Sequence, residues 1–490
     1  MPVASRIDLE SLLEGELRDG RTDDPFRPAV LRWAMLTGRP ADHDAVLGLL
    51  EAMATPGRGS RRFRWRLPVG SWMPLEQRVR WRPAEAELAE RNANAHATRL
   101  WLPLVLVEHL AWLEELASGP DPVPAARARA LLDEALPVTE DVVAATVAGG
   151  DAWGDTFLLW SFSRSPRALS RVRGLVLALA ARYAARAGRS GGIVRGRSFP
   201  FFDQPMTSAT AHLATASATL GEGIESLDEQ LAWLQAERRP DGGWGDPRQP
   251  SDLLTTLAVT RLLGAIDPSF DPTSAVGPLR TMAEAAGARP MLIGPEWPWM
   301  AAELALLTAW ADRPFTERFR WPNVPPSAMD PRVGVPRFEG YLALADLFKA
   351  VPALGRGHVD VAFIDLANFG KWNTQHGMAA GDELLALLTS QLRELPRSRT
   401  YRDGGDEFLV VGAPGTGELE ESLAGLCARW PEVQRAALPD RPVVPLRTVI
   451  NREPADDLRD SRARLGVRIG SVKRTHRHPP DEGVIVRYAR

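Results

Sequence analysis

Cysteine, lysine and long apolar runs are scarce in this chain of 490 residues. Its single cysteine, Cys427, excludes an internal disulfide framework and a zinc site built from several cysteines. Cys427 lies on a leucine-rich stretch, which predicts a small core residue. The longest apolar stretches are short and contain charges, and the acidic amino terminus has no apolar signal core. We therefore expect a cytoplasmic protein that does not enter a membrane.

The basic residues are almost all arginine, and they do not outnumber the acids. The 59 basic residues include only the lysines at 349, 371 and 473, and the formal net charge is −3. No global basic field therefore points to nucleic acid as a partner. Residues 61–81 alternate arginine with apolar and aromatic residues, which favours a hairpin or extended arms. Such arms could also stack on single-stranded nucleic acid, but an exposed ribbon with one packed face is the favoured interpretation.

The length predicts two or three domains. Residues 1–320 show helical apolar spacing broken by Pro- and Gly-rich joints, which suggests a series of helical hairpins. Residues 321–331 are rich in proline and form the clearest linker. In residues 332–490 strands alternate with helices, which predicts an α/β or α+β domain with helices packed on a mixed sheet. The expected strands are 358–366, 406–413, 443–451 and 482–488, and the expected helix is 381–395.

Three carboxylates stand near the ends of two predicted strands. Asp365 comes near the end of one buried strand, and Asp406 and Glu407 follow two glycines and lead into another. If these strands are neighbours, the acids converge at one edge of the sheet. Hard divalent cations such as Mg²⁺ bind such oxygens and usually bring phosphates with them. Gly404 and Gly405 would permit positive φ and a close approach of a triphosphate to the backbone. Alone, the same residues could form an ordinary hairpin turn with solvated acids.

The motifs around these acids together resemble the GGDEF family of nucleotide cyclases, which make cyclic di-GMP from two GTP molecules. The resemblance rests on "DPRVGVPRF", "FIDLANFGKWNTQHGMAAGDELL" and "RDGGDEF", whose order and spacing agree from residue 330 onward. It implies a palm-like α/β cyclase fold, GTP as substrate, and Mg²⁺ or Mn²⁺ as cofactor. It also implies a homodimer, because each 3′-oxygen attacks the α-phosphate bound by the facing domain.

The same resemblance implies a role for individual residues. The catalytic acids would be Glu407, Asp406 and Asp365. The metal ligands would be Asp365, the backbone carbonyl of Leu366, and Asp406. Asn373 and Asp382 match the pair that hydrogen-bonds the guanine edge, a kind of recognition that rejects bases which leave these groups unpaired. The remaining substrate-binding residues, which would face the phosphates, are Gly404, Gly405, Lys371, Lys473 and Arg477.

Several positions depart from the family pattern. Ala367 stands where a second acid is expected, and Gly370 stands at the family's lysine position, with Lys371 one residue later. Thr374 replaces an aspartate. These departures leave two alternatives open. One is a divergent cyclic nucleotide or oligonucleotide synthase, such as those of antiphage signalling. The other is a catalytically dead module that binds nucleotide or protein.

The segment "LAWLQAERRPDGGWGD", residues 231–246, resembles the QW repeat of α/α-toroid proteins such as terpene cyclases and prenyltransferases. In those proteins the repeat ties helix ends together, which is a structural role. The resemblance implies that residues 1–320 form an α/α-toroid-like sensor or interaction domain that regulates the cyclase. No D-x-D-D acid motif is found in it, and the zinc set of prenyltransferases is excluded because Cys427 lies in the other domain. A cavity lined by aromatic residues could still bind a small apolar ligand, and the surface could bind a protein.

Overall fold

The computed structural model describes residues 8–20, 26–53, 102–136, 152–184, 192–194, 205–222, 226–247, 249–287, 297–324, 328–415 and 417–488. The chain divides into two compact units. Unit 1 consists of Met1–Gly264 and Asp271–Arg313, and unit 2 of Ala265–Phe270 and Pro314–Arg490. The expected linker, residues 321–331, lies within unit 2. The arginine-rich segment 61–81 lies outside the described residues. Within the described ranges, no helix is both long and apolar enough to cross a bilayer.

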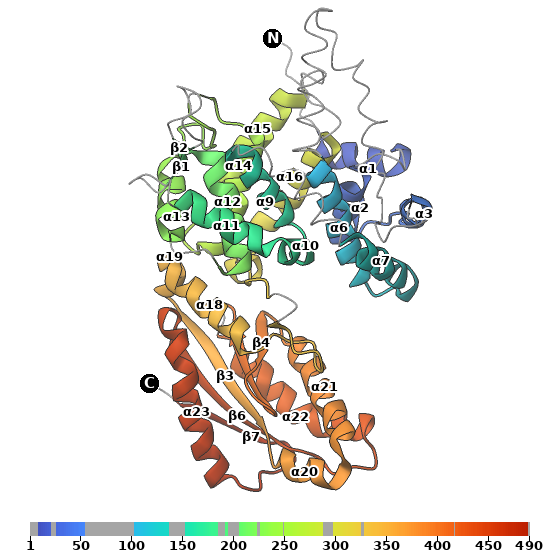
Figure 1. Cartoon of the computed structure of the whole chain (residues 1–490), viewed down its shortest axis with the longest axis vertical. Helices are drawn as coiled ribbons and strands as arrows, with labels where there is room; N and C mark the ends of the chain where they lie inside the picture. The colour runs from blue at the N-terminus through green and yellow to red at the C-terminus, as the bar shows by residue number, and fades with distance from the viewer. Residues whose placement is uncertain are drawn as a thin grey trace, which may run out of the picture. The chain divides into compact units, whose positions relative to one another are not determined.

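Unit 1 is built mainly from helices, as its apolar periodicity predicts (Figure 1). Its helices are α1 (Leu9–Asp19), α2 (Arg27–Leu36), α3 (Asp44–Met53), α6 (Leu102–Ala117), α7 (Pro122–Ala135), α9 (Ala152–Phe162), α10 (Pro166–Arg171), α11 (Arg173–Ala184), α12 (Thr207–Leu220), α13 (Leu227–Ala236), α14 (Leu253–Ile266, which ends in unit 2), α15 (Thr273–Gly287) and α16 (Trp297–Ala311). Two short strands, β1 (Ile193–Val194) and β2 (Pro205–Met206), pair antiparallel. A core of buried Leu, Val and Ala side chains joins the helices.

The segment that resembles a QW repeat forms a compact turn between α13 and α14. Trp244 is fully buried, and its Nε1 donates to the carbonyl of Leu234 in α13 at 2.6 Å. Its backbone N–H donates to Oγ1 of Thr256 in α14 at 2.9 Å. Gly242 takes a φ of +82°, a conformation that favours glycine. The turn therefore ties the end of one helix to the next.

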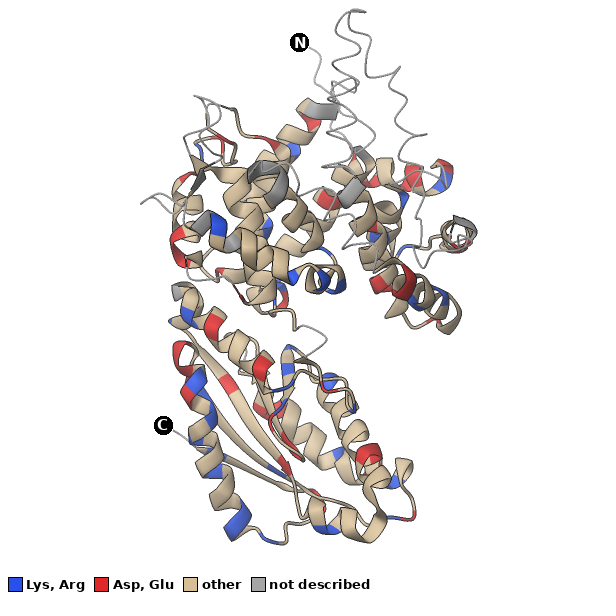
Figure 2. Ribbon diagram, in the orientation of Figure 1, with Lys and Arg blue, Asp and Glu red and all other residues tan. Residues whose placement is uncertain are grey.

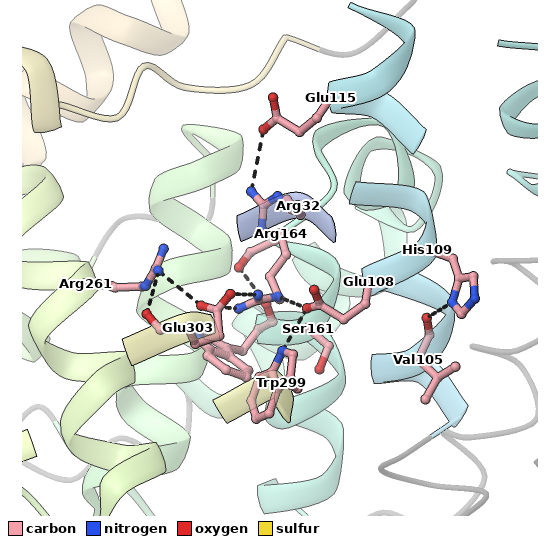
Figure 3. Close-up of polar contacts among 12 residues, drawn as sticks. Arg32, Val105, Glu108, His109, Glu115, Ser161, Arg164, Arg261, Trp299 and Glu303 are labelled. Atoms are coloured by element: carbon pink, nitrogen blue, oxygen red, sulfur yellow. Dashed lines mark hydrogen bonds and ion pairs between the residues drawn. The ribbon is translucent and has the colours of Figure 1, made fainter. Parts of the chain in front are cut away.

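A network of ion pairs is buried inside unit 1 (Figure 3). The guanidinium of Arg164 contacts the carboxylates of Glu108 and Glu303, and each of these side chains is at most 7% exposed. Nε1 of Trp299 donates to Oε1 of Glu108 at 3.0 Å, and Arg261 lies 3.1 Å from Oε2 of Glu303. Although burial opposes ionisation, Arg164 and Arg261 lower the pKa of Glu303 to about 2. The interior of unit 1 therefore contains charged side chains whose ionisation depends on their ion-pair partners.

Unit 2 contains a five-stranded mixed sheet with helices on both faces (Figure 1). The strand order is β4 (Ser398–Arg402), β5 (Glu407–Gly412), β3 (His358–Leu366), β6 (Leu446–Pro454) and β7 (Val484–Tyr488). Neighbouring strands are antiparallel except β6 and β7, which are parallel. The helices are α17 (Phe315–Arg318), α18 (Phe338–Ala350), α19 (Pro352–Gly355), α20 (Phe369–His376), α21 (Met378–Arg393), α22 (Leu419–Ala437) and α23 (Leu458–Thr475), with a 3₁₀ turn at Ala455–Asp457.

Side chains alternate along β3, so its two faces have different neighbours. Ala362, Ile364 and Leu366 lie in a core cluster with side chains of α21 and α22. Cys427 of α22 lies in the same cluster, and burial raises the pKa of its thiol to about 11. Asp365 lies on the opposite face, where it contacts α23. Figure 2 shows that Lys and Arg recur along this helix.

Candidate active site

Three polar residues lie side by side across the central strands of unit 2. Asp365 on β3 is the register partner of Glu407 on β5 and of Arg447 on β6. Directly opposite residues of antiparallel strands project to the same face, so the three side chains are neighbours. The structure therefore brings together Asp365 and Glu407, two of the acids singled out from the sequence. Asp365 is only 2% exposed, so its charge requires close partners.

Both carboxylate oxygens of Asp365 are held by cationic side chains. Oδ1 lies 2.7 Å from Nζ of Lys473, and Oδ2 lies 2.9 Å from Nη1 of Arg447. The same Nζ lies 2.7 Å from Oε1 of Glu407, so one ammonium group bridges two acids. Partial burial opposes the charge of Lys473, but its hydrogen bonds to Asp365 and Glu407 raise its pKa above the ordinary value.

Arg447 connects these acids to the chain that follows α23. Its Nε donates to the carbonyl of His476 and its Nη2 to that of Arg477, both at 3.0 Å. Nδ2 of Asn368 also donates to the carbonyl of Arg477, at 3.3 Å. The backbone of Arg477 is therefore fixed at the site, while the residue itself is exposed. Sequence reasoning missed Arg447, because nothing distinguishes it from the other arginines until the register of β3 and β6 is known.

Asp406 joins the acids from the turn before β5. Burial raises its pKa above the ordinary value, and the charges of Asp365 and Glu407 raise it further, against an opposing effect of Lys473. Its carbonyl accepts a hydrogen bond from the N–H of Leu366 at 3.4 Å, which places the turn beside the end of β3. All three predicted acids therefore influence one another in this unit.

Arg402, also missed from the sequence, holds the turn that carries the two glycines. Its Nε donates to the carbonyl of Gly404 at 3.0 Å and its Nη2 to that of Gly405 at 2.6 Å. Its Nη1 lies 2.9 Å from Oδ2 of Asp330, at the start of the domain's opening motif. A second arginine, Arg462 of α23, binds the carboxylate of Asp403 with its Nη2 at 2.9 Å from Oδ2.

Neither Gly404 nor Gly405 adopts the positive φ that glycine would permit. The turn closes instead through the N–H groups of Asp403 and Gly404, which donate to the carbonyl of Glu407 at 2.9 and 3.3 Å. A Cβ at Gly404 would lie 3.1 Å from Oε2 of Glu407, whereas a Cβ at Gly405 would meet nothing within 4 Å. The glycines thus matter for space around the turn, not for a left-handed backbone.

The predicted guanine-binding pair lies on two consecutive helices. Oδ1 of Asn373 on α20 is buried, and no hydrogen-bond partner is found for it in the described part of the chain. It lies against Gly381 of α21, where a Cβ would overlap it. The next residue, Asp382, has a side chain that is 46% exposed and lies 3.7 Å from Nη1 of Arg332. A buried acceptor next to an accessible carboxylate suits a ligand with several N–H donors, such as a guanine edge.

Lys371 is exposed on the same helix, two positions before Asn373. Residues two apart on a helix do not share a face, so the structure does not bring Lys371 and Asn373 together. A Cβ at Gly370, the position where the family has its lysine, would meet nothing within 4 Å. A side chain at position 370 would therefore not clash with its surroundings. The lysine at 371 instead of 370 changes the direction in which the positive charge projects from the helix.

The Mg²⁺ or Mn²⁺ expected from the sequence does not fit the residues as they are arranged here. Carboxylate oxygens are suitable ligands. However, no group of three or more His, Cys, Asp and Glu among the described residues has the arrangement of a metal site. Both oxygens of Asp365 and one of Glu407 are held by Lys473 or Arg447. Ala367 offers no side-chain ligand.

The helical unit contains one cavity whose lining can be compared with the apolar ligand site expected from the sequence. A cavity of about 620 Å³ lies between α1 and α15. Its lining includes Asp8, Glu10, Arg280, Thr281 and Glu284. These residues are polar or charged, so this cavity does not have the aromatic lining expected for an apolar ligand.

Comparison with known proteins identifies the domain that carries the acids. The family model "Diguanylate cyclase, GGDEF domain" matches residues 342–429. This part of the chain is a GGDEF domain. The match covers Asp365, Asn373, Asp382 and the turn with Asp406 and Glu407. GGDEF domains bind GTP and cyclic di-GMP, typically dimerise, and generally use Mg²⁺ when they are diguanylate cyclases.

Individual proteins are similar to a part of the chain. An uncharacterized signaling protein of Caulobacter vibrioides is 36% identical over 100 residues, which are 20% of this chain and 12% of that protein. The chain thus spans only a small part of the curated relative it matches. The GGDEF domain of DgcB from Caulobacter crescentus, in complex with c-di-GMP, is 15% identical, with a TM-score of 0.28, over 33% of this chain and 95% of that one. The FimX GGDEF domain from Pseudomonas aeruginosa is 18% identical, with a TM-score of 0.25, over 33% and 99%.

Proposed function

We propose that this protein condenses two GTP molecules into cyclic di-GMP and releases pyrophosphate. The observation that carries the proposal is the register of Asp365 opposite Glu407 inside a domain that the GGDEF family model matches. Fold similarity alone would not indicate chemistry, because function depends on the site. Here the acids, the glycine turn and a lysine from α23 meet in one place, which supports a nucleotidyl transfer site.

The acids and the lysine have distinct roles in this proposal. Glu407 is partly exposed beside the glycine turn and accepts the proton of the attacking 3′-hydroxyl. Asp365 and Asp406 orient the reacting groups, and Lys473 and Arg477 bind the triphosphate. We assign no step to a divalent ion, since the arranged residues do not fit one.

The remaining substrate contacts follow from the same geometry. The open space at Gly405 admits the phosphates to the turn. Asn373 accepts from the guanine edge, and Asp382 accepts from its N1 and N2 donors. Adenine offers an acceptor at N1, so it would leave the Asp382 carboxylate unpaired.

The proposed reaction requires two copies of the chain, because each domain binds one GTP and the two 3′-oxygens attack across the interface. GTP as substrate also indicates a cytoplasmic location. In this proposal unit 1, which contains the segment resembling an α/α-toroid repeat, controls how the two copies meet. Its role would therefore be regulatory.

The test is to incubate the purified full chain with GTP or ATP, in the presence of Mg²⁺ or Mn²⁺, and to identify the products by mass spectrometry. Cyclic di-GMP is expected from GTP with the wild type. It should disappear in Glu407→Gln and persist in Glu421→Gln, which changes an exposed glutamate of α22. An adenine-containing product would contradict the role of Asp382. Bound GTP without turnover would contradict the cyclase activity itself.

A further inference from the structure

We propose that Lys473 is an internal counter-ion that occupies the position of a divalent ion between Asp365 and Glu407, so that a metal binds there only after Lys473 leaves. The inference rests on the proposed function, since it concerns the same acids. It explains why three carboxylates gather in a unit where no metal arrangement is found among the described residues.

The geometry supports this assignment directly. Nζ of Lys473 lies 2.7 Å from Oδ1 of Asp365 and 2.7 Å from Oε1 of Glu407. An ammonium group has three donors and no acceptor, so it can bridge two carboxylates as a cation does. The bridged residues are register partners on neighbouring strands, so the bridge joins two positions of the sheet that do not move independently.

The charges of the site lead to the same conclusion. Asp365, Asp406 and Glu407 can carry three negative charges, and Lys473 and Arg447 contribute two positive ones. The buried Asp365 therefore has compensation without a metal. A divalent ion that contacted the same oxygens would lie beside the Lys473 ammonium, and repulsion between the two cations makes their binding mutually exclusive.

The two cations differ in how easily they can leave. The Arg447 side chain is 5% exposed and is held by Asp365 and by the carbonyls of His476 and Arg477. The Lys473 side chain is 35% exposed on a flexible stem, and it forms its ion pairs with the acids themselves. Lys473 is therefore the movable group. Arg447 is a positioning residue that keeps the end of α23, and with it Lys473, at the acids.

Direct metal titration tests the proposal without nucleotide. Chelator-treated full-length protein is titrated with Mn²⁺ alone, and free Mn²⁺ is measured by electron paramagnetic resonance. Lys473→Gln is expected to bind one Mn²⁺ at least about fivefold more tightly than the wild type, in the usual range of coupling between sites. Lys349→Gln, which changes an exposed lysine of α18, is expected to match the wild type. Adding Asp365→Asn to Lys473→Gln should abolish the gain.

Unchanged or weaker Mn²⁺ binding in Lys473→Gln would overturn the proposal. Lys473→Met provides a second variant if the first does not fold, with circular dichroism as the check. Because no GTP is present, the result is separate from the proposed function. A missing cyclic di-GMP product would refute the cyclase while leaving a tightened Mn²⁺ site intact, and equal Mn²⁺ affinities would refute the counter-ion while leaving the activity.

Discussion

The amide oxygen of Asn373 lies against Gly381, at a point where no side chain fits. A Cβ there would overlap Oδ1, so Gly381→Ala must displace the amide that we assign to guanine. We expect GTP affinity to fall at least about tenfold, as for other losses of a buried polar contact. Isothermal titration calorimetry with GTP measures the effect. Gly370→Ala is the control, because its Cβ meets nothing and should leave affinity unchanged. Equal GTP affinities in both variants would contradict the role of Asn373.

Arg402→Lys should keep the positive charge but lose the hydrogen bonds that hold the glycine turn. Arg402 contacts two carbonyls and a carboxylate with three different nitrogens of its planar guanidinium, a geometry that the single nitrogen of a lysine side chain cannot reproduce. We expect the rate of cyclic di-GMP formation to fall at least about tenfold, since small misplacements of catalytic groups are costly. Faster amide hydrogen exchange at Asp403 and Gly404, whose N–H groups donate to the carbonyl of Glu407, should accompany it. Arg393→Lys, at an exposed position of α21, should behave as wild type. Retained exchange protection in Arg402→Lys would show that the turn does not need this side chain.

Glu303→Gln should destabilise unit 1 strongly. Glu303 is 1% exposed and compensates both Arg164 and Arg261, so the change leaves buried positive charge (Figure 3). We expect the free energy of unfolding to fall by about 3 kcal/mol, as when one partner of a buried pair is removed. Urea denaturation followed by circular dichroism measures it. Glu115→Gln breaks a contact of 3.6 Å at a 38% exposed side chain and should cost less than about 1 kcal/mol. Similar losses in both variants would argue against the buried network.

Acid should destabilise unit 1 through His109. Burial lowers the pKa of His109 to about 4, against a hydrogen bond with the carbonyl of Val105 that raises it. His109 therefore becomes protonated near pH 6.5 in the unfolded chain but only near pH 4 in the folded chain. The free energy of unfolding falls as the pH is lowered from about 6.5 to 4. Between pH 7.5 and 5 this amounts to about 2 kcal/mol. His109→Leu should remove that part of the pH dependence of urea unfolding. The exposed His478→Leu should not, and an unchanged pH dependence in His109→Leu would refute the assignment.

The strands and the acids could be predicted from the sequence where the apolar pattern of a strand and the spacing of the family motifs point to the same residues. The expected strand 358–366 is β3, and Asp365 near its end lies on a strand that neighbours that of Glu407. The edge strand β4 was missed because "SRTYR" is polar and gains its order from pairing with β5.

The cations around the acids could not be predicted in the same way. Arg447 faces Asp365 only because of the register between β3 and β6, and a shift of one residue would turn it to the other face. Gly404 and Gly405 do not adopt the positive φ that glycine would permit. The hydrogen bonds from Arg402 to their carbonyls were not predicted, because they come from a side chain whose placement is not visible in local sequence.

The contacts of Arg402 also have a mechanical consequence. Asp330 begins a turn in which the N–H of Gly334 donates to the Asp330 carbonyl at 2.8 Å. The carboxylate of Asp330 also pairs with the guanidinium of Arg402, which binds the carbonyls of the two glycines. A displacement of the chain just before Asp330 would therefore be transmitted to the hairpin through the planar guanidinium of Arg402. An upstream event could in this way alter the spacing of the acids as a small strain, while the fold of the domain stays the same.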